Sequence, residues 1–465
     1  MRAETSRIES TRFEDVLGIE RSISPLCFSV LAIMIIAIGG FVVRIALVAT
    51  GSRGDAQPLV VLGDELSRRG HQVVLGVSPN LVPFGDKAGL TTFPVGPDSQ
   101  QFLESPDGQR WLAAGDVTAL TQALGKIVHD NAALLDADTL RVCDGADLIV
   151  TGSLSEHRAA CVAEAHGVPL VCLHYAPMRP TGAYPNMLIT TGRLPRRRNL
   201  ATHSMFQRLY WRSMAQDINT FRAGLGLAPV STPTATRLAA VGTLELQAYH
   251  SALVPDLGDY PPHRPIIGFL APDHELRERL GELEVDPETD AWLTDGEPPV
   301  FVGFGSMPVT DPVATLDMIT TVADRVGTRV LVGAGWSRFG QHQAQGDRVR
   351  VATGVLNYDR VLSRCRVAVH HGGSGTVAAS VAAGIPTFVC SLVADNPFWG
   401  ARVEQLGIGV HERFADLDQD RLETGLRRAM HPEVITRSRA IGDTVRADTG
   451  AAGRAADLIE SKLPD

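Results

Sequence analysis

The sequence predicts an α/β protein built from two parallel sheets covered by helices. Apolar runs typical of buried strands alternate with amphipathic helical stretches twice along the chain, first from Arg44 and again from Val300. Such alternation is typical of parallel sheets with helices on both faces. At 465 residues the chain is also too long for one ordinary core, so two domains of about 200 residues each are expected. The Pro-rich segment 253–265 (LVPDLGDYPPHRP) is the best candidate for a linker between them.

The first alternation accounts for residues 44–225. Its strands are short apolar runs bounded by Gly or Pro, and its helices carry one apolar face. In chain order we expect a strand at 44–50, a tight turn at 51–55, a helix at 57–69, strands at 71–78 and within 88–97, a helical stretch at 116–140, a strand at 146–151, a helix at 156–166, a strand at 170–174, a loop at 176–195 and helices within 204–225.

The second alternation follows the linker. It predicts domains at 43–252 and 266–440, with 441–465 as a C-terminal helix that packs back toward the first domain. In chain order we expect strands at 300–304, 329–333, 349–352, 366–369 and 387–392, helices after 311, at 358–363 and at about 376–383, an aromatic loop after 395, and a helical region from near 418 to 463.

The N-terminal segment is unusual because residues 23–43 carry no charge. About 20 apolar residues suffice to span a bilayer. A core strand begins directly at Arg44, however, and residues 1–20 show no helical periodicity. We therefore expect residues 1–42 to be an N-terminal extension outside the functional protein, with a membrane anchor or a cleaved signal as the alternatives.

Charge and cysteine usage exclude several classes. A net charge of −9 and a single short basic run, 196–198, give no indication of a nucleic-acid partner. The six cysteines (27, 143, 161, 172, 365 and 390) are scattered and form no CxxC pair. Because most lie in apolar segments, we expect buried free thiols in a reducing, cytoplasmic compartment, and neither disulfides nor zinc.

The stretch 370–400 (HHGGSGTVAASVAAGIPTFVCSLVADNPFWG) carries the clearest chemical signal. A strand runs into a Gly-rich turn and a helix, so that free backbone N–H groups and the helix dipole favour an anion. His371 and Thr376 add side-chain donors to this turn. Asp395 and Asn396 follow the next strand, where a doubly wound sheet presents ligand-reading groups. A diphosphate beside hydroxyl-reading groups indicates a nucleotide sugar.

Plainer interpretations of the same residues stay open. Adjacent residues at a strand end point in opposite directions, so a metal site on His370 and His371 is disfavoured. In our interpretation His371 faces the diphosphate and His370 packs. Thr376 is also a candidate helix cap, and Asp395-Asn396 is also a candidate for a simple turn.

The turn at 51–55 (GSRGD) lies where a dinucleotide-binding fold has its phosphate loop. It is not GxGxxG, and the second strand does not end in an acidic residue, so hydride transfer is disfavoured. Asp55 is either an N-cap of the following helix or a general base at the mouth of a cleft, able to take a proton from a hydroxyl. The two roles are compatible.

In these motifs and their order, the chain resembles the GT-B-fold glycosyltransferases of family 1, in which two Rossmann-like domains face a central cleft. It is most similar to the branch of sterol glucosyltransferases, glycopeptide-antibiotic glycosyltransferases and mycobacterial glycopeptidolipid glycosyltransferases. The resemblance runs from about Arg44 to the C-terminal helix. It is carried by GSRGDAQP (51–58), PMRPTGAYP (177–185), FVGFGSM (301–307), GW (335–336), LNYDRVLSRC (356–365), HHGGSGT (370–376) and DNPFWG (395–400).

The resemblance implies a role for residues in each block. Asp55 and His371 would be catalytic, with Asp55 as the base. The donor diphosphate would contact Ser306, His371, Gly373, Ser374, Gly375 and Thr376, and the base of the nucleotide would contact Trp336, Val355 and Leu356. The donor sugar would contact Asp395 and Asn396, and the acceptor would contact Met178, Thr181 and Tyr184.

The implied reaction is an inverting, metal-independent transfer of a hexose from a nucleoside-diphosphate sugar to a hydroxyl of a hydrophobic acceptor (glycolipid, peptidolipid, sterol or polyketide), with no cofactor besides the co-substrate. The family usually has Asp-Gln where this chain has Asp395-Asn396. This difference puts glucose in doubt, so both UDP-glucose and a dTDP-6-deoxy sugar are candidate donors. A nucleotide-sugar epimerase and a non-catalytic nucleotide-sugar-binding protein of the same fold are the alternatives. Peripheral association with the inner face of a membrane and the oligomeric state are left open.

Overall fold

The computed structural model describes residues 42–113, 117–309, 311–337, 339, 348–354 and 356–463. Residues 43–465 form one compact unit. The expected domain boundaries inside this unit stay predictions, and residues 1–41 of the extension expected at 1–42 lie outside the described residues. No helix in the described part of the chain is both long and apolar enough to cross a membrane.

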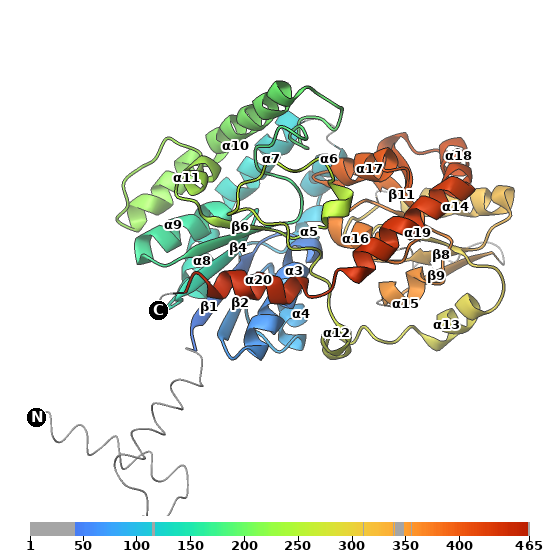
Figure 1. Ribbon diagram of the computed structural model, residues 1–465, viewed down its shortest axis with the longest axis horizontal. Coiled ribbons are helices and arrows are strands. Elements are labelled where there is room, and N and C mark those ends of the chain that lie inside the picture. The colour runs from blue at the N-terminus through green and yellow to red at the C-terminus, as the bar shows by residue number, and fades with distance from the viewer. Residues whose placement is uncertain are drawn as a thin grey trace, which may run out of the picture. The chain divides into compact units, whose positions relative to one another are not determined.

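Two sheets organise the fold, and all their strands are parallel (Figure 1). Each has six strands, with the order β3-β2-β1-β4-β5-β6 in the first and β12-β11-β10-β7-β8-β9 in the second. The predicted α/β class with two Rossmann-like sheets is therefore confirmed. The strands are β1 (Arg44–Ala49), β2 (Gln72–Val77), β3 (Thr91–Pro94), β4 (Leu148–Gly152), β5 (Leu170–His174), β6 (Leu244–Gln247), β7 (Val300–Gly303), β8 (Val330–Gly333), β9 (Val349–Ala352), β10 (Val367–His370), β11 (Thr387–Ser391) and β12 (Gly409–Arg413).

Helices cover both faces of each sheet, as parallel strands require. The described helices are α3 (Arg53–Arg68), α4 (Val82–Lys87), α5 (Ser99–Glu104), α6 (Pro106–Ala113), α7 (Val117–Asp130), α8 (Ala132–Cys143), α9 (Glu156–His166), α10 (Arg196–Gly224), α11 (Thr234–Ala240), α12 (His274–Leu280), α13 (Pro287–Thr294), α14 (Pro312–Val326), α15 (Tyr358–Leu362), α16 (Ser374–Ala382), α17 (Asn396–Gln405), α18 (Gln419–Ala429), α19 (Pro432–Ala447) and α20 (Ala451–Glu460).

The strand β1 shows how the core is divided. Ile45 and Leu47 pack in the cluster that includes α3 and α20, whereas Ala46 and Val48 pack in the cluster that includes α8, α9 and α10. Successive side chains of a strand point to opposite faces, so a central strand must be apolar throughout. This explains why the strands appear in the sequence as continuous apolar runs. The five cysteines in the described part of the chain are free and buried, as expected.

Two expected helix starts are wrong, and the reason is capping. Helix α3 begins at Arg53 and not at 57, because Ser52 is its N-cap and Asp55 completes a capping box from the third helical position. Asp55 is therefore not the N-cap. Helix α16 begins at Ser374 with Gly373 as N-cap, so Thr376 is not a cap either.

Three longer segments also differ from the expectation. Residues 396–405 form α17 in place of the expected aromatic loop, with Asp395 at its N-cap position. The stretch expected as one helix at 116–140 is divided near Asn131 into α7 and α8. Helix α10 is continuous and begins at Arg196, eight residues before the expected start.

The C-terminal helix α20 packs on α3 of the first sheet (Figure 1). Ala455, Ala456 and Ile459 are fully buried in the cluster that contains the α3 leucines. Arg69, the residue after α3, lies 2.6 Å from Asp457 and 2.8 Å from Glu460. The chain thus returns to its first sheet after completing the second.

This packing predicts a stability difference between two neighbouring positions. Ile459→Ala should lower the free energy of unfolding by about 2–5 kcal/mol, because it leaves a cavity between α20 and α3. Asp457→Ala, which removes only a solvent-exposed ion pair, should cost less than about 1 kcal/mol. Urea unfolding followed by circular dichroism measures both, and equal effects would contradict the packing role of Ile459.

Candidate active site

The candidate site lies at the carboxyl ends of the strands, where each sheet reverses its winding direction. In the first sheet the reversal is between β1 and β4, and in the second it is between β7 and β10. Ligands of doubly wound sheets bind at such points. Asp55 follows β1, Gly305 and Ser306 follow β7, and His371 follows β10. The predicted catalytic and diphosphate residues therefore flank both switch points.

Asp55 is held by the first turn of α3. Its carboxylate accepts a hydrogen bond from the Ser52 backbone N–H at 2.9 Å. Its backbone carbonyl accepts a hydrogen bond from the Tyr175 hydroxyl, which follows β5, at 2.8 Å. Gly51 (φ +118°) leaves room for this carboxylate, since a Cβ at position 51 would collide with Asp55 Oδ2. The turn after β1 thus fixes the carboxylate, and the segment after β5 fixes the backbone that carries it.

Asp55 and Asp395 interact electrostatically although they follow strands of different sheets. Burial raises the pKa of Asp55 to about 7, hydrogen bonds from Ser52 oppose this shift, and the negative charge of Asp395 adds to it. Burial likewise raises the pKa of Asp395 to about 6, against the hydrogen bond from Trp399. Two carboxyl groups with such pKa values are typical of a site that moves protons.

Asp395 is aimed by the start of α17. The indole Nε1–H of the fully buried Trp399 donates to Asp395 Oδ2 at 3.0 Å. Asn396 is buried, and its side chain donates to Asp395 Oδ1 at 3.3 Å while accepting from the Val393 backbone N–H at 3.4 Å. Ala394 precedes the pair with φ +57°, an uncommon backbone conformation for a residue other than glycine. Asn396 therefore supports Asp395, and contact with the sugar stays a prediction for both.

The two adjacent histidines have different environments. His370 is buried, its Nδ1 accepts from the Gly372 backbone N–H at 3.0 Å, and its Nε2 lies 3.2 Å from the Ser380 hydroxyl. His371 is also buried, but its Nδ1 has no hydrogen-bond partner among the described residues. Burial lowers the pKa of His371 to about 4, so it is neutral at pH 7. His370 belongs to the core, and His371 is free to meet a ligand.

Glycines bring the turns of the second sheet into close contact. A Cβ at Gly373 would lie 2.5 Å from His371 Nε2, and one at Gly305 would lie 3.3 Å from His371 Cε1. Gly372 (φ +94°) packs against Asn396, since a Cβ at position 372 would lie 3.4 Å from the Asn396 Cβ. The turns after β7, β10 and β11 thus form one continuous edge. Thr376 and the first-turn residues Ser374 and Gly375 lie on the same edge, at the N-terminus of α16.

The residues predicted to hold the nucleotide base follow β8 and β9. Trp336 donates its backbone N–H to the Gly305 carbonyl at 2.9 Å, so it adjoins the turn of Ser306. Its side chain packs in a small cluster with Leu103 of α5 and Val393, which follows β11. Leu356 packs next to Gly333 at the end of β8. Val355 lies outside the described residues.

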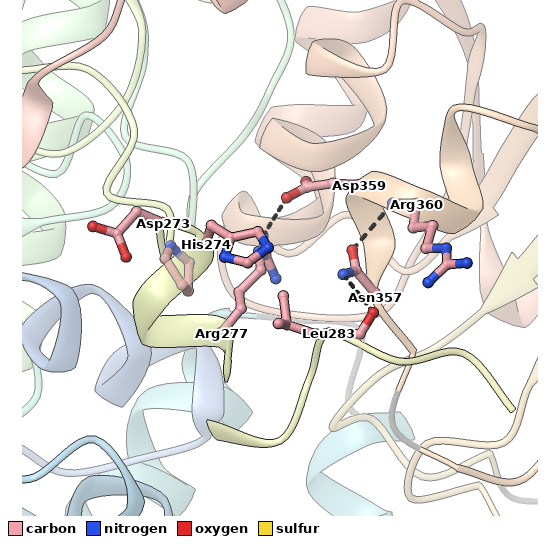
Figure 2. Close-up of a pocket in the computed structure, with 8 residues that line it drawn as sticks. Asp273, His274, Arg277, Leu283, Asn357, Asp359 and Arg360 are labelled. Atoms are coloured by element: carbon pink, nitrogen blue, oxygen red, sulfur yellow. Dashed lines mark hydrogen bonds and ion pairs between the residues drawn. The ribbon is translucent and has the colours of Figure 1, made fainter. Parts of the chain in front are cut away.

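A surface pocket lies beside Leu356, between α12 and α15 (Figure 2). Arg277 and Asp359 form an ion pair across it at 2.8 Å, and the Asn357 side chain caps the start of α15. Its other charged side chains pair with residues outside the lining, Asp273 with Arg68 and Arg360 with Glu284 and Asp290. The pocket is lined by Pro272, Asp273, His274, Arg277, Leu283, Asn357, Asp359 and Arg360.

The predicted acceptor residues lie in a tightly packed loop. Thr181 is buried and donates its hydroxyl hydrogen to Asp259. Tyr184 is buried, stacks edge-on against Phe398 with ring centroids 5.6 Å apart, and lies under the Arg402 guanidinium. Met178 is partly buried in the same cluster. These contacts join the loop to α17, and an acceptor role for the three residues stays a prediction.

A buried ion network, which could not be recognised from the sequence, anchors this loop. Arg179 binds Glu156 at 2.7 Å and Glu245 at 2.8 Å, and Arg264 forms a second ion pair with Glu245. Arg179 and His174 lower the pKa of Glu156, although burial opposes this. Glu156, His174 and Cys172 are close enough to ligate a metal ion together, but the Glu156 carboxylate is already paired with the Arg179 guanidinium. The charges balance within the network, so its composition fits a structural role.

Comparison with known proteins assigns the fold to a family. The model for the Erythromycin biosynthesis protein CIII-like, C-terminal domain, matches residues 335–460. A Mycobacterium tuberculosis protein named as an uncharacterized glycosyltransferase is 34% identical over 422 residues, which are 90% of this chain and 98% of its own length. The O-mycaminosyltylonolide 6-deoxyallosyltransferase of Streptomyces fradiae is 30% identical over 421 residues, covering 88% of this chain and 94% of its own length.

A solved structure extends the likeness to the backbone. The glycotransferase of kitacinnamycin superposes with a TM-score of 0.66 at 21% identity, covering 91% of this chain and all of its own. At this identity the match shows the fold alone, and the fold is the two-sheet arrangement described above. Because relatives above 30% identity align over almost their whole length, the chain belongs to family 1 of the GT-B glycosyltransferases, enzymes that use sugar nucleotides.

Proposed function

We propose that the protein transfers a hexose from a nucleoside-diphosphate sugar to a hydroxyl group of a hydrophobic acceptor, with inversion at the anomeric carbon. The observation that carries this proposal is the electrostatic interaction of Asp55 with Asp395, next to which the His371 turn packs against Asn396. One carboxylate can take a proton from the acceptor, the other can bind the sugar, and the turn can hold the diphosphate. All three are fixed by the protein before a ligand arrives.

Asp55 is suited to act as the general base. A base is most effective when its pKa lies near the working pH, and the pKa of Asp55 is raised to about 7. It would accept the hydroxyl proton while the acceptor oxygen attacks the anomeric carbon from the side opposite the leaving group. The transition state resembles an oxocarbenium ion, as in glycoside hydrolysis, but the nucleophile is an acceptor hydroxyl.

The leaving diphosphate would be stabilised by fixed dipoles. The N-terminus of α16, beginning at Ser374, presents its first backbone N–H groups beside His371. Donors held in advance at the developing charge are a large source of rate enhancement. His371 is neutral because of its burial, so it would act as a hydrogen-bond donor to a phosphate oxygen and not as a cation. No step of this mechanism requires a metal ion.

The donor sugar that we favour is a 6-deoxyhexose, with UDP-glucose as the second candidate. Asn396 is a shorter amide than the Gln usual in the family, and its side chain is engaged with Asp395 and Val393. It therefore offers less reach toward a distant hydroxyl of the sugar. The name of the Streptomyces fradiae relative, a 6-deoxyallosyltransferase, agrees with this preference. A screen of dTDP-rhamnose, dTDP-glucose and UDP-glucose for thermal stabilisation and hydrolysis tests it directly.

The role of Asp55 predicts a separation of binding from turnover. Asp55→Asn should retain donor binding, measured by calorimetry, and should lose turnover by about 10²–10⁴-fold because the base is gone. An asparagine oxygen can still accept the Ser52 N–H, so α3 should keep its start. Ser52→Ala serves as the control, because it weakens the cap by about 0.5–2 kcal/mol and leaves the carboxylate in place. Normal turnover in Asp55→Asn would end its assignment as the base.

The raised pKa of Asp55 predicts the pH dependence of the reaction. The base works only when ionised, so kcat/KM should fall as the pH drops below about 7 and should level off above it. The pH profile of kcat/KM for the wild-type enzyme measures this limb. A rate that stays constant down to pH 5 would show that no group with the pKa of Asp55 controls the reaction.

The two histidines predict opposite phenotypes. His371→Ala should lower kcat by about 10²–10³-fold, because it removes a hydrogen-bond donor to the leaving group. Thermal stability should fall little, because the Nδ1 atom of His371 has no hydrogen-bond partner in the described part of the chain. His370→Ala should lower the melting temperature, since it breaks the hydrogen bonds to Gly372 and Ser380. Steady-state kinetics and thermal unfolding of both variants test this, and the reverse pattern would exchange their roles.

A further inference from the structure

Helix α10 carries a surface to which the proposed mechanism assigns no residue. One side of this 29-residue helix is buried against the first sheet through Trp211, Met214 and Ile218. The helix lies along the outside of the first half of the fold (Figure 1). The opposite side faces solvent along several turns, with exposed positions at Arg197, Arg198, Ala201, Ser204, Met205, Arg208, Leu209 and Arg212, which we call the α10 outer face.

The outer face is strongly basic in a protein of opposite net charge. From Arg193 to Arg212 the chain contains six arginines and no Asp or Glu, although the whole chain carries −9. Arg196 lies 3.6 Å from Asp259. Among the described residues, no acidic side chain lies within 4.0 Å of the other five. The positive charge of this face is therefore largely unneutralised.

Apolar side chains lie within the same basic face. Met205 and Leu209 are one helical turn apart and are 47% and 36% exposed. With Ala201, Ser204, Arg208 and Arg212 they line a shallow hollow of about 480 Å³. Exposed apolar side chains flanked by arginines are characteristic of helices that lie in a membrane interface, because the apolar groups enter the acyl boundary while the guanidinium groups meet lipid phosphates.

We propose that the α10 outer face docks the protein on an anionic lipid surface, with the helix axis parallel to the bilayer. At a rise of 1.5 Å per residue, the stretch from Arg196 to Arg212 extends about 24 Å, so its arginines can contact several headgroups together. The negative net charge disfavours any other orientation on an anionic membrane. This docking is independent of the proposed transfer reaction and needs neither donor nor acceptor.

Vesicle binding tests the proposal. The full-length protein should co-sediment with vesicles of phosphatidylcholine containing 30% phosphatidylglycerol and should bind pure phosphatidylcholine vesicles at least tenfold more weakly. Each basic contact near an anionic surface strengthens binding by roughly fivefold. The double variant Arg208→Glu, Arg212→Glu should therefore lose about 10²-fold or more. Met205→Ser with Leu209→Ser should weaken binding most clearly at high salt, where only the apolar contribution remains.

A charge-matched control separates the surface from the net charge. Arg427→Glu with Arg428→Glu makes the same change in net charge at exposed positions of α18 and should leave vesicle binding within about twofold. Circular dichroism and donor hydrolysis confirm that the variants are folded. Equal binding to neutral and anionic vesicles, or equal losses in the α10 and α18 variants, would overturn the proposal. The proposal would also be overturned if light scattering showed a dimer that the double variant Met205→Ser, Leu209→Ser dissociates. The α10 outer face would then join two copies of the chain.

Discussion

The burial of Asp55, with the negative charge of Asp395 nearby, is the constraint on which the proposed chemistry depends. Each carboxylate alone is an ordinary residue at the start of a helix, α3 or α17. Burial is the main reason that the pKa of Asp55 rises to about 7, and the nearby negative charge of Asp395 adds to the rise. A group that would be a poor base at its usual pKa is thereby brought to the working pH. The proposed reactivity thus comes from burying a charge, which opposes stability.

The fold holds these two charges together by means that have no part in the chemistry. Tyr175 and the capping box fix Asp55 from the first sheet, and the Trp399 indole fixes Asp395 from the second. Between them, Gly305 and Gly373 let the turns after β7 and β10 close around His371. A side chain at either glycine would meet the imidazole ring. The two carboxylates proposed to act on the ligand are therefore held by neighbours, Tyr175 and Trp399, to which no ligand contact is assigned.

Much of this arrangement could be predicted from the sequence, because central parallel strands and Gly-rich turns leave strong local signals. Helix α9 and strands β5 and β9 lie where the periodicity placed them. The start of α3 could not be predicted in the same way, since two glycines in GSRGD favour a turn and the Ser52–Asp55 capping box outweighs them. Asp395-Asn396 likewise resembled a turn, because a proline follows at position 397. This proline lies in the first turn of α17, where proline is tolerated.

Contacts between distant segments left no sequence signal. The Arg179 network joins residues from 156 to 264, and only the fold brings them together. The repulsion between Asp55 and Asp395 spans 340 positions and was equally invisible, although both residues were identified separately. The difference between His370 and His371 was expected from strand geometry, but the unpartnered Nδ1 of His371 appears only in the packed structure.

The most direct test of the account is a carboxyl titration of Asp55 by carbon-13 NMR in the wild-type protein and in Asp395→Asn. We expect a pKa near 7 for Asp55 in the wild type and a lower value in the variant, since a charge that opposes its ionisation is removed. An Asp55 pKa near 4 in the wild type, or one that Asp395→Asn leaves unchanged, would show that the two carboxylates do not share one site.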